Sequence, residues 1–330
     1  MNNNSLKYGF VILHYNAFEM TIQCVDNLLT MFGNKEIHIV LIDNASPNGS
    51  GITLQEKYKE HKKVTVILHD KNEGFARGNN IGFNYLKNNY DIEYMIVMNN
   101  DIFIQSLNFL EKIKEIHTEY NFDILAPDII VPQSQRHQNP LGYQVPTAEH
   151  CRKGIKDMRR AIRQENIKYY KLKILHYCIY KWAKPIAKRL FPRLYNKITH
   201  KNTNQSTINQ ITIQNHYQPN IMEGIIPHGA CLIYSHRFIQ KRHYAFYPET
   251  FMYGEENILA LQCNEEGYKI IYHPDKDLIV HHLCHISTNT IKKNYHQTSL
   301  FYWEQNSKSF NIYIKLFEEY AQKKKSKTKC

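Results

Sequence analysis

The sequence predicts an α/β protein with a mainly parallel sheet, and two observations carry this prediction. Segments with helical spacing of their apolar residues occupy 17–32 and 75–89. Short apolar runs typical of buried strands stand before, between and after them, at 8–14, 37–42, 64–69 and 94–98. Strands that alternate with helices in this way form parallel sheets through right-handed crossovers.

The elements follow in order along the chain. The helix at 17–32 is amphipathic, because three- and four-residue steps place one apolar set on a single face: Ile22, Val25, Leu28, Leu29 and Phe32. The second strand ends at 43–51, a run of turn-forming residues that leads into a short polar helix. Beyond the fourth strand, 107–119 predicts a helix, and 124–131 predicts a strand interrupted by Pro127.

Polar residues that can bind ligands follow three of these strands. They are Asp43 after the second, the loop 70–80 after the third, and Asn99, Asn100 and Asp101 after the fourth. Because parallel strands end at the same edge of a sheet, we expect these groups to converge. A carboxylate there could hold a divalent cation, and the cation could hold a diphosphate. The alternative is that the Asn-Asn-Asp triplet caps the next helix.

The loop at 70–80 favours a ligand that carries phosphate. Its glycines allow close approach to the backbone, and Arg77 could pair with a phosphate group. No Gly-x-Gly-x-x-Gly follows the first strand, and no Gly-Lys-Ser/Thr occurs in the sequence. Dinucleotide-binding and P-loop sites are therefore disfavoured.

From 133 to 218 the composition becomes basic, aromatic and polar, and we interpret this part as a helical insertion. Within it, 169–194 mixes aromatic and aliphatic residues with a basic set that includes Lys181, Lys184, Lys188 and Arg189. Such a segment could lie on an anionic bilayer surface. The alternative is a solvated pair of helices that covers the active site.

The last third predicts a buried strand after Gly229 and Ala230, and then a helix that begins at Glu255 and Glu256. Acidic residues in a first helical turn are stabilised by the helix dipole. Alternatively, one of them is a general base, since removing a proton from a hydroxyl needs a carboxylate or imidazole within hydrogen-bond reach.

Two further strands are predicted at 269–273 and 278–280, and the second ends at His281 and His282. Either histidine could be a metal ligand. A zinc site built from both of them and Cys284 lacks the spacing of closed zinc sites. The chain is expected to close with a helix at 289–321 and a disordered lysine-rich tail at 323–329.

Composition narrows the class of partner. The formal charge of +12 and the pI near 9.1 indicate an anionic partner, such as nucleic acid, a phosphorylated sugar donor or an anionic membrane. The seven cysteines are scattered and never form Cys-x-x-Cys, which is typical of a reducing cytoplasm. We see no signal peptide and no apolar run of the ~18 residues that a membrane span needs. We therefore expect a cytoplasmic protein, at most peripheral at the inner face of the cell membrane.

Four motifs resemble a known family. They are Val11-Ile12-Leu13-His14-Tyr15-Asn16, Ile42-Asp43-Asn44-Ala45-Ser46, the run from Asn72-Glu73-Gly74 to Ile81-Gly82, and Asn99-Asn100-Asp101 as a variant of Asp-x-Asp. In this order they resemble family 2 glycosyltransferases of the GT-A type, in particular the rhamnosyltransferase-like branch that builds bacterial surface polysaccharides. The resemblance covers roughly 1–131 and 222–290.

The resemblance implies an inverting transfer of a hexose or deoxyhexose from a nucleoside diphosphate sugar to a saccharide acceptor. It implies Mg²⁺ or Mn²⁺ held by Asp101 and a histidine five residues before a serine, which selects His282 with Ser287 and leaves His281 open. The family carries Glu-Asp where this chain has Glu255 and Glu256, so the resemblance makes Glu256 the general base and Glu255 its support.

The resemblance also assigns the substrate contacts. Gly229 and Ala230 would form the wall beside the sugar and the acceptor. The donor nucleotide would be bound by residues from the first four strand ends: Asn16, Asp43, Asn72, Gly74, Arg77, Asn79, Asn99 and Asn100. The acceptor would be lipid-linked, as is usual for enzymes of O-antigen and capsule synthesis.

The expected organisation is one GT-A domain with an insertion. Its nucleotide-sugar half is 1–132, the insertion 133–218, the acceptor half 219–290, and the C-terminal helix and tail 291–330. Two rivals remain. A nucleotidyltransferase would need a basic phosphate-binding loop near the first strand, which 14–17 does not supply. A nucleic-acid-binding or polyanion-binding module would suit the charge but leaves the polar strand ends unexplained, so we expect no nucleic-acid partner.

Overall fold

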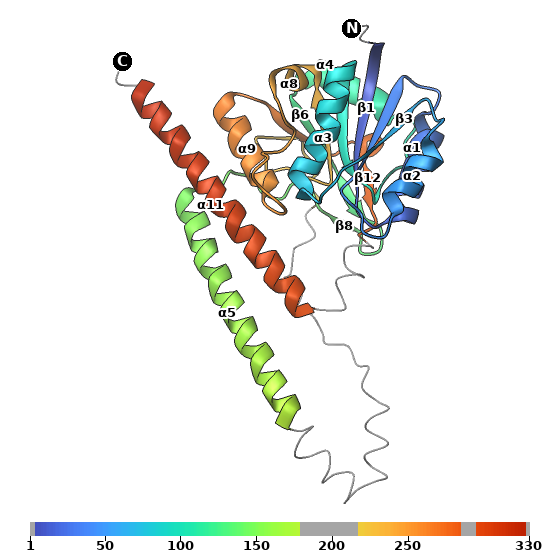
Figure 1. The fold of residues 1–330 in the computed structure, drawn as a ribbon. Helices are drawn as coiled ribbons and strands as arrows, with labels where there is room; N and C mark the ends of the chain where they lie inside the picture. The colour runs from blue at the N-terminus through green and yellow to red at the C-terminus, as the bar shows by residue number, and fades with distance from the viewer. Residues whose placement is uncertain (1–3, 179–216, 285–294, 328–330) are drawn as a thin grey trace, which may run out of the picture.

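The computed structural model describes residues 4–178, 217–284 and 295–327, and it shows the predicted α/β architecture (Figure 1). The main sheet has eight strands in the order β3-β2-β1-β4-β10-β6-β11-β9. In chain order these are β1 (Asn4–His14), β2 (Ile37–Asp43), β3 (Val64–Leu68), β4 (Tyr90–Asn99), β6 (Ile124–Pro127), β9 (Met222–Glu223), β10 (Cys231–Ser235) and β11 (Ile270–His273). A smaller sheet has the order β5-β12-β7-β8, with β5 (Ile102–Ile104), β7 (Ile129–Val131), β8 (Arg136–His137) and β12 (Val280–His282).

Helices cover both faces of the main sheet, because alternate residues of its central strands point to opposite sides. On β1, Phe10 and Ile12 pack into one core cluster and Val11 into the other. The first cluster is completed by α1 (Phe18–Phe32), α2 (Ser50–Tyr58) and α4 (Phe109–Tyr120). The second is completed by α3 (Gly74–Asn89), α8 (His236–Lys241) and α9 (Glu255–Glu266).

Strand pairing brings the predicted polar ends together. β1 is parallel to β2 and to β4, with His14 opposite Asp43 and Leu13 opposite Asn99. β10 is antiparallel to β4, so the residues just before β10 reach the same edge. The prediction that these strand ends share an edge is confirmed.

Most predicted elements are present, including the interruption at Pro127, where β6 ends and β7 follows. The position predicted for the last strand, 278–280, is wrong. Residues Lys276–Leu278 form a 3-10 turn, which Asp275 caps by accepting a hydrogen bond from the Asp277 backbone N–H. The strand therefore begins at Val280 and includes both histidines that were expected to follow it.

The segment predicted as an insertion, 133–218, contains a strand as well as a helix. Strand β8 pairs with β7, and α5 (Ala148–Cys178) then packs along α11 (Tyr295–Lys327) (Figure 1). A third core cluster joins both helices to α9 through Cys151, Ile258, Leu261, Tyr313 and Leu316. The basic residues Lys181, Lys184, Lys188 and Arg189 and the predicted partner Ser287 lie outside the described residues.

The prediction of a disordered tail is wrong for 323–327, because α11 continues to Lys327. Contacts with α9 explain the longer helix: Lys324 pairs with Glu265 at 2.7 Å, and the Tyr320 hydroxyl donates a hydrogen bond to Glu266. Within the described ranges, no helix is both long and apolar enough to cross a membrane.

Candidate active site

A carboxylate and an imidazole meet at the centre of the sheet edge. Asp101 follows β4, and His282 lies on β12, which pairs antiparallel with β5 so that His282 is opposite Ile102. This pairing brings His282 Nε2 to 3.2 Å from Asp101 Oδ1. Both residues are only 8% exposed. The structure therefore brings together two residues that were predicted as metal ligands from distant parts of the sequence.

Gln138 fixes the orientation of His282. Its Oε1 lies 2.7 Å from His282 Nδ1, so Nδ1 donates to Gln138 and Nε2 faces Asp101. Burial alone would lower the pKa of His282, but hydrogen bonds to Asp101 and Cys284 raise this pKa to about 9. His281 pairs with Phe103 and Ile130, and burial lowers its pKa. Of the two histidines, His282 is the one beside Asp101.

The segment from His228 to Ala230 forms a wall beside this pair. The His228 ring is 5.9 Å from the His282 ring, and its Nδ1 accepts a hydrogen bond from the Ala230 backbone N–H. Ala230 in turn accepts, through its carbonyl, a hydrogen bond from the Asn99 backbone N–H at 2.8 Å. The wall is thus attached directly to the end of β4.

Glu256 contacts the same wall. The Gly229 backbone N–H donates to Glu256 Oε1 at 3.3 Å. A Cβ on residue 229 would stand 2.9 Å from that oxygen, so the close approach depends on glycine. Glu255, the preceding residue, is 2% exposed, and its buried Oε1 has no hydrogen-bond partner within the described ranges. Of the two predicted carboxylates, Glu256 is the one that borders the wall.

At the start of α9, Glu255 is buried and Glu256 is partly buried. Burial, together with the neighbouring Glu256, raises the pKa of Glu255 to about 8. Burial also raises the pKa of Glu256, against the lowering effect of its backbone hydrogen bonds. A carboxylate with a raised pKa holds a proton more readily near neutral pH, as a general base must.

The buried position of Glu255 predicts a pH-dependent stability. Its pKa is higher in the folded chain than in the unfolded chain, so the folded state loses stability as pH rises from the ordinary value of 4.5 towards 8. Glu255→Gln removes that ionisation. We expect the melting temperature of the variant minus that of the parent to increase by a few degrees as the pH rises from about 5 to about 8.5. Thermal unfolding across this range checks it, and a difference that stays constant with pH would contradict it.

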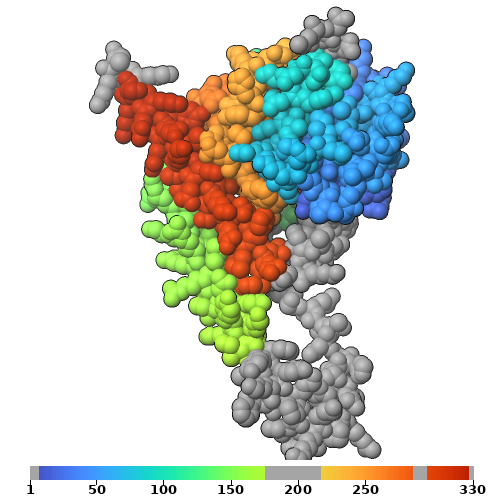
Figure 2. Space-filling model, in the orientation of Figure 1, coloured from blue at the N-terminus to red at the C-terminus, as the bar shows by residue number. Residues whose placement is uncertain are grey.

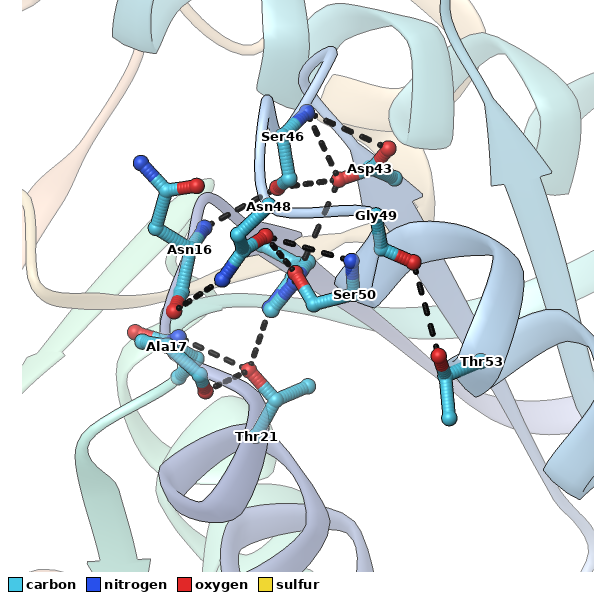
Figure 3. A network of polar contacts seen from close by, with 11 residues as sticks. Asn16, Ala17, Thr21, Asp43, Ser46, Asn48, Gly49, Ser50 and Thr53 are labelled. Atoms are coloured by element: carbon cyan, nitrogen blue, oxygen red, sulfur yellow. Dashed lines mark hydrogen bonds and ion pairs between the residues drawn. The ribbon is translucent and has the colours of Figure 1, made fainter.

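A network of hydrogen bonds surrounds Asp43 at the end of β2, in the loops predicted to bind the donor nucleotide (Figure 3). The Ser46 hydroxyl donates to Asp43 Oδ1 at 2.5 Å and accepts from the Asn16 backbone N–H at 2.9 Å. Asn48 donates from Nδ2 to the Asn16 carbonyl at 3.0 Å. Asn16 has a positive φ of 60°, and its buried Oδ1 has no hydrogen-bond partner within the described ranges. That oxygen can accept a hydrogen bond from a ligand.

His14 connects this loop to the end of β4. Its Nε2 lies 2.7 Å from the Ser50 hydroxyl, which donates to Asn48 Oδ1 at 2.6 Å. Its Nδ1 lies 2.7 Å from the Thr21 hydroxyl, which also accepts from Asn100 Nδ2 at 2.8 Å. Burial lowers the pKa of His14, so a neutral ring donates on one side and accepts on the other. Asn100 therefore enters this network rather than pointing only towards a ligand.

Asn72 and Gly74 hold the shape of the loop that follows β3. Asn72 Oδ1 accepts from Asn44 Nδ2 at 3.0 Å and from the Gly74 backbone N–H at 2.9 Å. Gly74 has a φ of 79°, and a Cβ there would come within 2.1 Å of the Phe251 carbonyl oxygen. The loop is thereby joined to the segment that leads to Glu255.

Arg77 and Asn79 also make contacts within the protein. Arg77 Nε donates to the Pro248 carbonyl at 2.7 Å, and its guanidinium pairs with Glu73 at 3.3 Å. Asn79 is 1% exposed and donates to the Phe75 carbonyl within α3. Their assignment to the donor nucleotide stays a prediction, and these contacts show that both also hold the loop in place.

Sequence reasoning missed His228, Gln138 and His14 as parts of the site. His14 stood in a quoted motif and His228 directly precedes Gly229, but a single histidine in an apolar stretch carries no signal of its own. Gln138 was placed in the insertion. Only the pairing of β12 with β7 and β5 shows that it reaches His282.

The sheet and its polar edge are those of an α/β enzyme that binds its substrate at the carboxyl ends of its strands. Residues 10–183 match the model of glycosyl transferase family 2, which is more than half of the chain, so the chain belongs to this family of glycosyltransferases. The match continues past 131 and does not include 222–290, unlike the expected extent of the resemblance. A search of curated proteins gave no match.

Three solved structures illustrate the likeness. One is TarS 1–349 of S. aureus with UDP-GlcNAc, at 18% identity over 38% of this chain and 34% of that chain, with a TM-score of 0.32. Another is the mannosyltransferase PcManGT from Pyrobaculum calidifontis with GDP-Man and Mn²⁺, at 12% identity over 90% and 63%, with a TM-score of 0.48. The third is GalNAc-T7 with UDP, GalNAc and Mn²⁺, at 15% identity over 85% and 44%, with a TM-score of 0.48. The chain thus spans less than two thirds of each of these relatives.

Proposed function

We propose that this glycosyltransferase moves a hexose or deoxyhexose from a nucleoside diphosphate sugar to a hydroxyl of a saccharide acceptor, with inversion. The observation that supports it best is the wall at 228–230. Within three residues it contacts both the Asp101–His282 pair, through His228, and Glu256, through the Gly229 backbone N–H. Glycosyl transfer needs a cation that neutralises the leaving diphosphate and a base that takes the proton of the attacking hydroxyl, both close to one sugar.

Asp101 and His282 would hold the metal, Mg²⁺ or Mn²⁺. Their donor set fits such an ion, because one carboxylate oxygen and one imidazole nitrogen already lie 3.2 Å apart in a buried position. Within the described residues no group of three protein ligands is present, which suits an ion that takes its remaining oxygens from water and substrate phosphates. When bound, the ion would neutralise charge on the departing diphosphate.

The strand ends on the donor side would hold the nucleoside. Asp43 is fixed by the hydroxyl and the backbone N–H of Ser46, and Asn16 presents a side-chain oxygen without a partner in the described part of the chain. We assign Asp43 to the nucleobase, the loop 72–80 to the nucleoside, and Asn99 to the neighbourhood of the ribose.

Glu256 would remove the proton of the acceptor hydroxyl, and Glu255 would support it. On the acceptor side, aromatic side chains from α11 meet the loop before α9: the Tyr302 ring is 4.9 Å from Tyr253, and the Phe301 ring is 6.3 Å from Phe251. Burial and the charge of Glu256 raise the pKa of Tyr302, so its hydroxyl stays protonated. Partly exposed rings next to a base can pack against the C–H face of a saccharide.

The biological setting we propose is synthesis of a bacterial surface polysaccharide, O-antigen or capsule, by a rhamnosyltransferase-like enzyme. The acceptor would be a saccharide carried on a lipid. The enzyme would then meet it at the cytoplasmic face of the membrane.

The decisive experiment is a screen of UDP-, GDP- and dTDP-sugars with Mn²⁺, with Mg²⁺ and with a chelator, read as released nucleoside diphosphate. We expect one donor class to be hydrolysed slowly in a metal-dependent way. Release of pyrophosphate from a nucleoside triphosphate and a sugar phosphate would instead identify a nucleotidyltransferase. Salt-sensitive RNA binding without any metal-dependent nucleotide binding would contradict both glycosyl transfer and nucleotidyl transfer, and would favour a polyanion-binding module.

A further inference from the structure

One face of α5 changes from basic to apolar along its length. Alternating steps of four and three residues place six side chains in one row: Lys156, Arg160, Arg163, Ile167, Tyr170 and Ile174. All six are exposed, and the last three are 45%, 60% and 63% exposed. Large apolar side chains exposed at successive helical turns mark an interaction surface.

This row is not the face that packs on α11. That contact uses Cys151 near the start of α5, which clusters with Tyr313 and Leu316, and Tyr169, whose ring stacks on His296 with centroids 4.0 Å apart. At 100° per residue, the middle of the row lies roughly a third of a turn or more from those side chains. Tyr170 and Ile174 border a surface hollow of about 620 Å³. The C-terminal half of α5 also extends away from the main sheet (Figure 1).

The charge of α5 indicates an anionic partner. Between residues 148 and 174 there are nine lysines and arginines and three acidic residues. Two of the acids are engaged locally, Asp157 with Arg160 at 3.2 Å and Glu165 with His296 at 3.6 Å. Figure 2 shows α5 on one flank of the molecule, beside α11. The flank therefore presents excess positive charge next to the exposed apolar side chains.

We propose that the row from Lys156 to Ile174 docks α5 in the plane of an anionic lipid bilayer. The basic half would contact the headgroups, and Ile167, Tyr170 and Ile174 would enter the boundary between headgroups and acyl chains. The role of this surface rests on the proposed function, because docking would bring Glu256 to an acceptor carried on a lipid. The binding itself does not depend on sugar transfer.

The composition of the row favours lipid over single-stranded nucleic acid. Proteins that bind single strands stack bases on aromatic rings, and Tyr170 is the one ring in this row. Two exposed isoleucines at its end have no role in base stacking, whereas they can enter an acyl boundary.

The test is cosedimentation of the full chain with vesicles of phosphatidylcholine containing phosphatidylglycerol, and with vesicles of phosphatidylcholine alone. We expect binding to the anionic vesicles only, and weaker binding as salt rises. The variant Lys156→Gln, Arg160→Gln and Arg163→Gln should weaken binding about a hundredfold. The variant Ile167→Gln, Tyr170→Gln and Ile174→Gln should weaken it about tenfold or more.

Matched controls lie on the α/β domain. Lys57, Lys59 and Lys62, all exposed, are changed to Gln to give the same loss of charge. Ile52, Leu68 and Leu107 are also exposed and are changed to Gln to give the same loss of apolar surface. We expect both controls to bind like the parent. No vesicle binding by the parent, equal losses in the controls, or tighter binding to RNA through the same row would each overturn the proposal.

Nucleotide titration of the same variants separates this proposal from the proposed function. We expect the row variants to retain metal-dependent nucleoside diphosphate binding. If vesicles bind through the row but no nucleotide binds, the surface stands and the transferase proposal fails. If nucleotide binds but vesicles do not, the transferase proposal stands and the docking surface fails.

Discussion

Asp101→Asn is expected to lower turnover about a thousandfold, because a neutral amide cannot hold the divalent ion that offsets several kcal/mol of developing charge. The amide keeps the size of the side chain and can still hydrogen-bond His282, so the fold should survive. Two measurements check this: released nucleotide at saturating donor and Mn²⁺, and calorimetric nucleotide binding with and without Mn²⁺.

Asp91→Asn is the matched control, because Asp91 lies near the other end of β4 and is exposed. We expect the control to behave like the parent in both measurements. If Asp101→Asn retains Mn²⁺-dependent turnover and binding, the metal is held elsewhere.

Glu256→Gln is expected to lower kcat by about 10² to 10⁴ with little change in donor affinity, since it removes a positioned base. The amide oxygen can still accept from the Gly229 backbone N–H, so the wall should remain intact. The parent rate should fall as pH drops through the pKa of Glu256, which burial raises above its ordinary value, and the variant should lose this dependence. Steady-state kinetics across pH, with nucleotide titration, measure both effects.

Glu255→Gln is the matched comparison, because it changes the adjacent residue in the same way. We expect a milder loss, because Glu256 rather than Glu255 accepts the hydrogen bond from the Gly229 backbone N–H at the wall. The reverse order of the two variants would move the base to Glu255.

Local sequence pattern was sufficient for most of the fold. The apolar runs at β1, β2, β3 and β4 have the length and composition of buried strands, and helix periodicity marks α1, α3 and α4. Patterns fail where the decisive contact is distant. The lysine-rich end of α11 looks disordered in isolation, and it is helical because Lys324 and Tyr320 contact α9.

For the site, the sequence by itself determined which chemical groups are present and that the ends of the parallel strands share an edge, because parallel pairing fixes that edge. It also supplied the motifs of the family to which the chain belongs. The family resemblance favoured His282 and Glu256, and only the tertiary structure shows which neighbour of each pair makes the contact. His282 rather than His281 meets Asp101 because β12 pairs with β5 in one register, and Glu256 rather than Glu255 meets Gly229 because adjacent residues of a helix point about 100° apart. Such choices depend on strand register and helix rotation, which are set by packing between distant segments and leave no mark on the residues themselves.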